Sequence, residues 1–361
     1  MKLSEFRYTL PAGLIAQQPL PERDGARLMV LDRRTGGGED RVFRDLPGLL
    51  APGDLVVLND TRVLPARLSA RKESGVRVEV LLLEKEGPGP GAAAPGGFCE
   101  SWRALVRGFG RRRPGARFEF EGALGVELIG EDSDPGGGGE VVRVLLRSPR
   151  PIEESLRRAG SPPTPPYIRR EPGDPRLLDD RERYQTVFAE APGAIAAPTA
   201  GLHFTHETLA EIRDRGAEIQ TLTLHVGWGT FQPVRVEEIE DHIVAPERCL
   251  IGAPLARAYE RAKSEGRRVV AVGTTVVRAL EDALDSRGRL RVGESRCGLV
   301  ILPGHRFRAV DALVTNFHLP ESSLLLLVAA FAGKESILSA YREGVRKQYR
   351  FYSYGDAMFI R

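Results

Sequence analysis

Cysteine is scarce in this chain of 361 residues, and lysine is hardly more common. The three cysteines, Cys99, Cys249 and Cys297, are widely spaced and form no CxxC pair, which argues against a disulfide framework or a zinc site. No apolar run reaches the ~20 residues that a membrane helix needs. The N-terminal residues also lack the apolar segment of a signal peptide. We therefore expect a soluble, cytoplasmic protein that contains no metal.

An excess of one charge is also absent. The formal net charge is only +3, from 52 basic and 49 acidic residues, so no global positive field indicates a nucleic-acid partner. The basic side chains are almost all arginine, which suits bidentate phosphate contacts and stacking on bases. Compositional bias of a GC-rich genome explains most of these arginines equally well. The length favours two domains over one.

The hydrophobic pattern predicts two kinds of structure. Short strands separated by Gly/Pro segments fill residues 63–150, which is typical of a small antiparallel barrel or sandwich. From about residue 185, apolar strands alternate with amphipathic helices, a pattern that predicts an α/β fold. We therefore predict a mixed sheet covered by helices in a discontinuous catalytic domain, residues 1–62 and 151–361, with a small antiparallel β-barrel domain inserted at residues 63–150.

Four polar loops follow predicted strands, at residues 197–205, 224–234, 272–281 and 315–322. Ligands of open α/β sheets bind outside the carboxyl ends of strands, and amides at helix starts bind anions. Each loop alone is a weak signal, because glycines and aromatics also make ordinary tight turns. Together they predict ligand-binding residues, namely Thr199, Ala200, Gly201, Gly227, Gly229, Thr230, Gly273, Thr274, Thr275, Arg278 and Asn316.

The C-terminal segment, residues 349–360, is unusually aromatic for a chain end. It combines three tyrosines and two phenylalanines with Arg350, Gly355, Asp356 and an apolar tail. Free termini are usually polar and frayed, so we expect this end to be docked in a core or to complete a site.

Six blocks of the sequence resemble the S-adenosylmethionine:tRNA ribosyltransferase-isomerase family of queuosine biosynthesis. They are residues 59–63, 197–205, 229–234, 272–281, 315–324 and 349–360. One block departs from the family pattern Asp-His-x-Met-His-x-Glu: here Val244 replaces the methionine and Ala245 the second histidine, whereas His242 and Glu247 remain. Either that second histidine has no essential acid–base role across the family, or this protein compensates for its loss. The departure also argues against a metal site in the block.

The resemblance implies a transferase that uses S-adenosylmethionine as a ribosyl donor and co-substrate. The implied acceptor is 7-aminomethyl-7-deazaguanine at the wobble position of tRNA, and the product is epoxyqueuosine-tRNA, with adenine and methionine released. The reaction begins by removing a proton from C5′, which needs a base of tuned pKa. The candidate bases are His203, His225 and His318, with Asp311 and Asp356 as partners or alternatives. The sulfonium's own charge makes a catalytic metal unnecessary.

A wobble base is bound by stacking on aromatic or arginine planes. The candidate tRNA-binding residues are Arg62, Arg107, Arg111, Arg112, Arg113, Arg350, Tyr352 and Tyr354, although each arginine of the 107–113 group is also typical of a solvated loop. A tRNA methyltransferase that uses the same co-substrate, and a non-catalytic tRNA-binding protein, are the alternative functions. We expect a monomer, since no heptad pattern indicates association.

Overall fold

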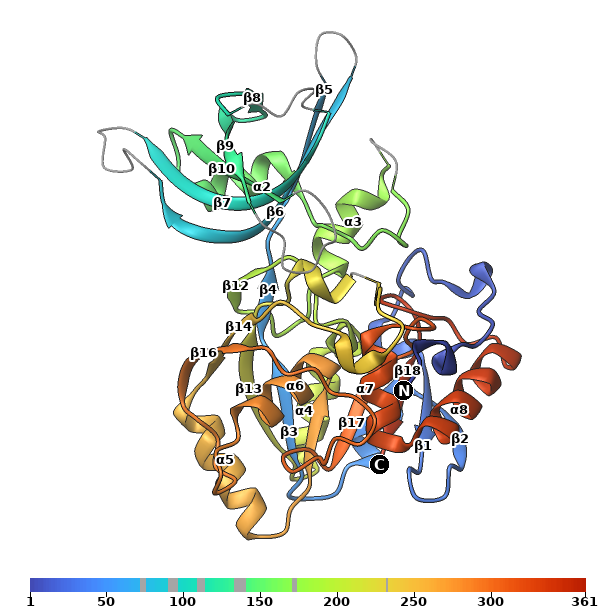
Figure 1. Ribbon diagram of the computed structural model, residues 1–361. Helices are drawn as coiled ribbons and strands as arrows, with labels where there is room; N and C mark the ends of the chain where they lie inside the picture. Colours follow the sequence, from blue (N-terminus) through green and yellow to red (C-terminus); the bar gives the residue numbers. More distant parts are fainter. Residues whose placement is uncertain (72–75, 90–96, 109–113, 133–140, 171–173, 232) are drawn as a thin grey trace.

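The computed structural model describes residues 1–71, 76–89, 97–108, 114–132, 141–170, 174–231 and 233–361 (Figure 1). Within these residues the larger sheet is mixed and has nine strands, in the spatial order β16 (Gly293–Cys297), β14 (Glu247–Ile251), β13 (Glu218–Leu224), β3 (Leu55–Asn59), β15 (Val269–Val272), β17 (Ala312–Asn316), β18 (Ala357–Ile360), β1 (Arg27–Leu31) and β2 (Gly38–Val42).

The second sheet is antiparallel and has seven strands in the described residues. Their spatial order is β11 (Gly160–Ser161), β5 (Arg67–Arg71), β6 (Arg77–Pro88), β7 (Phe98–Arg107), β10 (Val141–Ser148), β9 (Leu124–Glu131) and β8 (Arg117–Phe120). A short parallel pair, β4 (Thr61–Val63) and β12 (Ala191–Ala194), lies where the two sheets approach each other (Figure 1).

The centre of the mixed sheet is a run of parallel strands. β13 pairs with β3, β3 with β15 and β15 with β17, all in parallel. Every residue of β3, β15 and β17 is buried, because strands covered on both faces need continuous apolar sequence. All four strands therefore have their carboxyl ends at one edge of the sheet.

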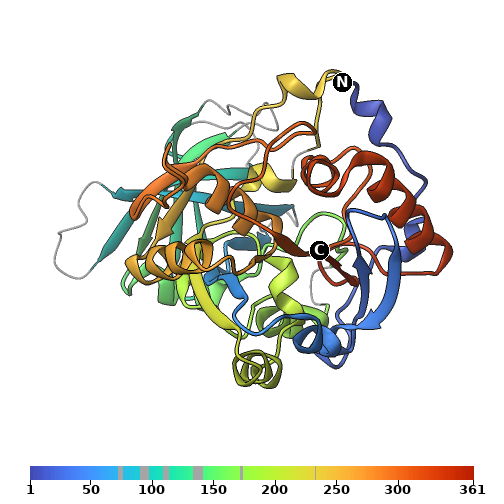
Figure 2. The same cartoon turned by 90° about the horizontal axis from the view of Figure 1, so that it is seen from below.

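Helices cover both faces of this sheet (Figures 1 and 2). They are α1 (Leu46–Leu49), α4 (His206–Asp214), α5 (Ala253–Ser264), α6 (Thr274–Ala283), α7 (Ser323–Ala332) and α8 (Lys334–Arg346). Helix α2 (Ile152–Ala159) packs on the antiparallel sheet, and α3 (Arg176–Arg183) follows in the connector between the sheets (Figure 1). Leu55 and Val57 face the core beneath α5–α8, whereas Val56 and Leu58 face the core beneath α1 and α4. The predicted mixed α/β fold with a helix-covered sheet is confirmed.

The most apolar helix, α7, is a core element. Leu325–Ala329 are all buried. Within the described residues no single helix is long and apolar enough to cross a membrane. The pair α7 and α8, bent by 116°, passes that length and composition test only when the two are taken together.

The antiparallel sheet differs in detail from the predicted barrel. Strands β5 to β10 fall within residues 63–150, but β11 joins the sheet from Gly160–Ser161 after α2. β8 and β11 form the two edges among the described residues, so the sheet is a curled half-barrel there and not a closed ring (Figure 1). Whether it folds as a separate domain stays a prediction.

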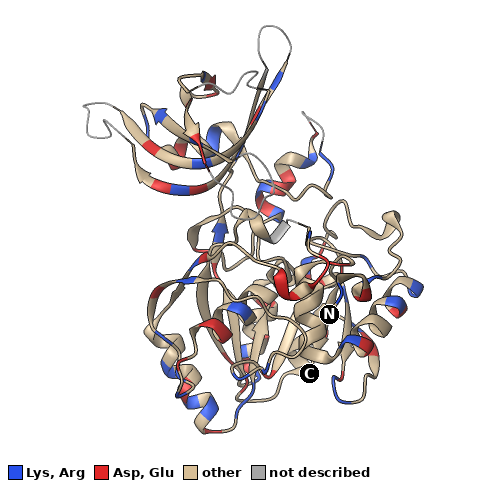
Figure 3. Cartoon of the chain, viewed as in Figure 1, with Lys and Arg blue, Asp and Glu red and all other residues tan. Residues whose placement is uncertain are grey.

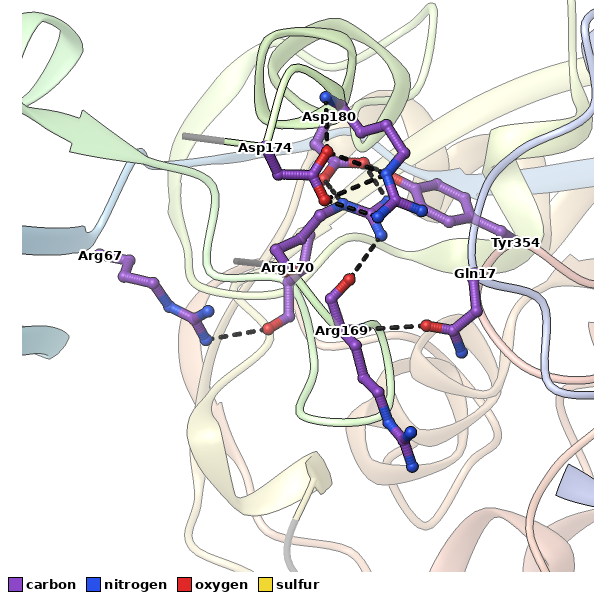
Figure 4. Close-up of polar contacts among 9 residues, drawn as sticks. Gln17, Arg67, Arg169, Arg170, Asp174, Asp180 and Tyr354 are labelled. Carbon is purple, nitrogen blue, oxygen red and sulfur yellow. Dashed lines mark hydrogen bonds and ion pairs between the residues drawn. The ribbon is translucent and has the colours of Figure 1, made fainter. Parts of the chain in front are cut away.

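A buried ion pair holds the connector between the two sheets. Arg170 donates to both carboxylate oxygens of Asp180, at 2.6 and 3.0 Å, and the two side chains are 2% and 1% exposed (Figure 4). The Tyr354 hydroxyl donates to the same carboxylate at 2.8 Å. On the same connector, Thr164 accepts from Arg67 of β5 at 3.0 Å. These contacts tie residues 164–180 both to the antiparallel sheet and to the C-terminal segment.

We predict that Asp180→Asn destabilises the protein strongly, because it leaves the Arg170 charge buried without its partner. The expected loss in the free energy of unfolding is about 3–5 kcal/mol, measured by denaturant titration. The control is Asp179→Asn on the exposed side of α3, for which we expect a change below about 0.5 kcal/mol. Equal small losses for the two variants would show that the buried pair does not stabilise the fold.

Candidate active site

The larger of two neighbouring cavities lies at the carboxyl edge of the parallel strands. Its volume is about 730 Å³, within the range of small-molecule sites. The loops after β15 and β17, the turn at Thr199–His203 and the C-terminal turn supply its walls. We call it the larger cavity. It brings together Thr199, Ala200, Gly273, Thr274, Thr275, Asn316, His318 and Tyr352 from the residues predicted by sequence.

One wall of the larger cavity is the N-terminus of α6. Gly273 precedes the helix with φ +93°, a left-handed conformation that favours glycine. The amides of Val276 and Val277 donate to the carbonyl of Gly273, and among the described residues no side chain caps the terminus. Unpaired amides at a helix start bind anions such as carboxylate. Thr274 and Thr275 line the cavity beside them.

Asn316 connects three distant segments at the floor of the larger cavity. Its Oδ1 accepts from the Thr199 hydroxyl at 2.9 Å, and its Nδ2 donates to the carbonyl of Tyr352 at 3.3 Å. Nδ2 also lies 3.2 Å from Nε2 of His203. Because an amide nitrogen can only donate, His203 accepts at Nε2 and is neutral. Burial lowers the pKa of His203 to about 4, in agreement with this role.

His203 itself does not line the larger cavity. Its ring packs on Phe43 at a centroid distance of 5.0 Å, in the core beneath α1 and α4. The contacts of His203 are therefore structural. His318 does line the cavity, and its Nε2 lies 2.9 Å from the Thr315 hydroxyl. Burial lowers the pKa of His318 to about 3, so the ring is neutral near pH 7.

His225 lines a second, smaller cavity of about 300 Å³. Residues after β13 form one wall, and strands β6 and β7 of the antiparallel sheet form another. Nδ1 of His225 lies 2.8 Å from the Thr61 hydroxyl, and partial burial and the charge of Arg248 lower its pKa. Val226 lines both cavities, so the two adjoin there.

The glycines of the predicted ligand loops have separate roles. Gly227 and Gly229 line the smaller cavity, and the amide of Gly227 donates to Glu247 at 2.7 Å. Gly201 lines neither cavity: a Cβ there would lie 2.8 Å from both Phe188 and Thr186, so close packing explains this glycine. The side chain of Thr230 lies outside the described residues.

Two predicted residues are occupied by structural contacts away from the larger cavity. Arg278 pairs with Glu247 at 2.5 Å and donates through Nε to the Leu299 carbonyl, and both charged side chains are buried. Asp311 lies at the opposite end of β17 from the cavity, where it accepts from Lys263 at 2.9 Å and from the amide of Val269 at 2.8 Å. The structure thus brings neither residue to the strand-end site.

Most of the predicted residues in the C-terminal turn are likewise held by structural contacts away from the larger cavity. Asp356 is buried and accepts from the amides of Arg27 and Arg350, at 2.9 and 2.7 Å, so it stabilises the turn itself. Arg350 donates to the carbonyl of Gln18, and Tyr354 is buried against Asp180. Of the residues predicted in this turn, Tyr352 lines the larger cavity, together with the neighbouring Ser353, and its ring packs on Tyr167 at a centroid distance of 3.9 Å. The expected docking of the chain end is confirmed.

Two further arginines of the predicted tRNA surface, Arg62 and Arg107, do not line the larger cavity. Both are exposed: Arg62 is the middle residue of β4 and donates to the carbonyl of Ala189 at 2.8 Å, and Arg107 is the last residue of β7. Arg111, Arg112 and Arg113 lie outside the described residues.

Sequence reasoning missed several cavity residues. Tyr167 lies in a proline-rich connector, and Glu100 and Trp102 are on a strand whose pattern indicates only a half-buried sheet. The aromatic character of Tyr167 was the one available signal, because partners in the fold decide which side chains of a strand line a cavity.

A helix-covered sheet with cavities at its strand ends defines a ligand-binding α/β protein. Residues 3–360 match the family model described as "Queuosine biosynthesis protein". The chain therefore belongs to the queuosine biosynthesis protein family.

Named relatives agree over the full length. The chain is 49% identical over 360 residues to the S-adenosylmethionine:tRNA ribosyltransferase-isomerase of Geobacter metallireducens, covering 100% of both chains. It is 50% identical to that of an Anaeromyxobacter species, covering 100% of this chain and 99% of the relative. A crystal structure of S-adenosylmethionine tRNA ribosyltransferase from Thermotoga maritima is similar with a TM-score of 0.53 and 35% identity, over 99% of this chain and 100% of that one.

Three histidines line the two cavities: His225 and His242 line the smaller one, and His318 lines the larger one. His225 and His318, the two that the sequence predicted as bases, can be separated by substitution. We predict that either His318→Gln or His225→Gln lowers kcat by about 10²–10⁴-fold, the usual contribution of a general base, while the other retains most activity. His305→Gln, whose imidazole stacks on Phe307 outside both cavities, is the control. The measurement is single-turnover release of adenine from S-adenosylmethionine. Near-normal rates in both variants would show that neither His225 nor His318 is the base.

The dependence of kcat on pH provides a second test of His318 as the base. Burial holds its pKa at about 3, below the usual 6.5, so it loses its neutral form only at strongly acid pH. We expect a step that needs neutral His318 to keep its rate as pH falls through 6.5. A kcat that falls with a midpoint near 6.5 would contradict this assignment, with Tyr fluorescence as the control for unfolding.

Proposed function

We propose that this chain is an S-adenosylmethionine:tRNA ribosyltransferase-isomerase. In this proposal it transfers and isomerises the ribosyl group of S-adenosylmethionine onto 7-aminomethyl-7-deazaguanine at the wobble position of tRNA. Epoxyqueuosine-tRNA forms, and adenine and methionine leave. The observation that carries the proposal is the pair of cavities that adjoin at Val226, because a two-substrate transfer needs neighbouring sites that hold the reacting atoms together. Family membership supplies the identity of the substrates.

The larger cavity fits S-adenosylmethionine better than the smaller one does. Its volume of about 730 Å³ exceeds the 300 Å³ of its neighbour, and this co-substrate is the larger of the two reacting groups. The free amides at the start of α6 suit the methionine carboxylate. The Tyr167–Tyr352 stack supplies an aromatic surface for the sulfonium. We propose these contacts in place of Arg278, which the sequence predicted as a ligand-binding residue, because its guanidinium forms an ion pair with Glu247.

The chemistry begins with loss of a C5′ proton beside the sulfonium. A neutral imidazole is the form that accepts a proton, and the lowered pKa values of His225 and His318 keep both rings neutral near pH 7. His225 faces the smaller cavity and His318 the larger one, so each remains a candidate base. We propose that Asn316 positions the floor of the larger cavity through Thr199 and Tyr352.

Contacts with tRNA remain proposals at the level of single residues. Tyr352 borders the larger cavity, whereas Arg62 and Arg107 are exposed away from it and suit phosphate contacts. The roles of Arg111, Arg112 and Arg113, the monomeric state, the cytoplasmic location and a reaction without metal stay predictions. Within the described residues no group of three or more His, Cys, Asp or Glu side chains lies close enough to hold a metal ion.

We predict that the protein, incubated with S-adenosylmethionine and tRNA bearing the aminomethyl deazaguanine, yields epoxyqueuosine with stoichiometric adenine and methionine. The measurement is mass spectrometry of nucleosides and small molecules. The control is the same tRNA with guanine at the wobble position, which lacks the nucleophilic amine. Formation of S-adenosylhomocysteine would identify a methyltransferase. Tight tRNA binding with intact S-adenosylmethionine would identify a non-catalytic tRNA-binding protein.

A further inference from the structure

The smaller cavity lies between the two sheets and has a wall from each. Lys85 and Glu84 come from β6, and Glu100, Trp102 and Arg103 come from β7. The opposite wall comes from the loop after β13 and from residues 242–248 of the mixed-sheet side. Trp228 of that loop packs against the core of the antiparallel sheet. The cavity therefore exists only because the two sheets are held together.

An ion pair spans the two sheets beside this cavity. Arg296 of β16 donates to Glu84 of β6 at 2.8 Å. Three basic side chains line the cavity, and each is paired with a carboxylate: Lys85 with Glu100, Arg103 with Asp132 and Arg248 with Glu294. Figure 3 shows both signs of charge along the antiparallel sheet, so this wall is polar and close to balanced in charge.

Glu100 is a carboxylate of the antiparallel wall whose two oxygens are each held by a hydrogen bond. Oε1 accepts from Lys85 at 2.6 Å, and Oε2 accepts from the indole N–H of Trp102 at 3.0 Å. The Glu100 side chain is 21% exposed. A carboxylate oxygen has two acceptor sites, so each oxygen can accept one further hydrogen bond while these contacts hold it in place. Two adjacent N–H donors on a flat ligand match that arrangement.

We propose that the smaller cavity binds the acceptor base, and that Glu100 accepts from its N1–H and exocyclic N2–H groups. The inference rests on the proposed function and adds the place and orientation of the acceptor. A 7-deazaguanine carries its N1–H and N2–H edge roughly opposite its 7-aminomethyl arm. Glu100 belongs to the antiparallel wall, whereas Val226, where the cavities meet, belongs to the mixed-sheet wall. Binding the edge at Glu100 therefore directs the arm toward the larger cavity.

The size of the cavity agrees with one base and not with a longer stretch of RNA. At about 300 Å³ it is at the lower end of small-molecule sites. A base bound there has left its stack, and enzymes that act on a base commonly hold it in such a pocket between apolar or aromatic side chains. Trp228 and Leu83 supply such side chains.

The test compares anticodon stem-loops that differ by one amino group. Stem-loops with guanine or hypoxanthine at the wobble position are titrated against the full chain in the presence of S-adenosylmethionine. Hypoxanthine lacks the exocyclic N2 amine, so the wild-type protein should bind the guanine stem-loop about tenfold more tightly, as expected for one hydrogen bond to a charged group. In Glu100→Gln, which loses the charge and one acceptor oxygen, that ratio should fall well below tenfold, because any remaining hydrogen bond is to a neutral acceptor.

The matched control is Glu86→Gln. Glu86 lies on β6 two residues from Glu84 and accepts from Ser101 and Arg143, at 2.8 and 3.0 Å, outside the cavity. It should keep the wild-type ratio. Because the ratio compares two ligands on one preparation, partial unfolding of Glu100→Gln does not change it. S-adenosylmethionine affinity should be unchanged in both variants, since Glu100 does not line the larger cavity.

The outcomes separate the two proposals. An unchanged guanine preference in Glu100→Gln, with normal epoxyqueuosine formation by the wild-type protein, would overturn the pocket assignment alone. Equal binding of the two stem-loops by the wild-type protein would overturn it as well. Absence of wild-type turnover on the aminomethyl tRNA would instead overturn the proposed function.

Discussion

The position of the last strand determines the shape of the larger cavity. β18 lies inside the mixed sheet, antiparallel to β17 and parallel to β1, with all four of its residues buried. Ala357 pairs with Asn316, so the turn before β18 must cross the strand-end edge. That turn needs Gly355, where a Cβ would lie 2.5 Å from the carbonyl oxygen of Arg350. Asp356 then holds the turn through two backbone amides.

Asn316 converts this backbone arrangement into a site. One amide contacts Thr199 and the ring of His203, which belong to one turn, and the carbonyl of Tyr352 in the C-terminal turn. Buried polar networks whose members are all paired rigidify their surroundings, whereas an unpaired member is costly. Tyr352 has φ +74°, an unfavourable conformation for a tyrosine, and its hydrogen bond to Asn316 helps to maintain it. The ring that borders the larger cavity is thereby held in place.

The sequence could predict where the site would form, but only part of its membership. Apolar runs such as 269–272 identify parallel strands, and the polar residues after them must lie at one edge, which is how Thr274, Asn316 and His318 were found. Residue type cannot show which partner neutralises a charge. Arg278, Asp311 and Tyr354 have the right chemistry for a site, yet Glu247, Lys263 and Asp180 bind them. The sequence also could not show whether the antiparallel strands form a closed barrel, because alternating polar and apolar residues identify a strand but not the closure of its sheet.

Charge balance favours a cationic substrate in the larger cavity. Burial lowers the pKa of His318 to about 3, so this ring adds no positive charge beside a sulfonium. Away from the larger cavity, Glu247 pairs the buried guanidinium of Arg278 and also accepts from Gly227, on the side of the smaller cavity. The same carboxylate thus neutralises a buried cation and orders the loop of the smaller cavity. Removing one partner of such a buried pair would leave an uncompensated charge in the interior, which is strongly destabilising. Pairing therefore explains why Arg278, despite its suitable chemistry, is not available at the strand-end site.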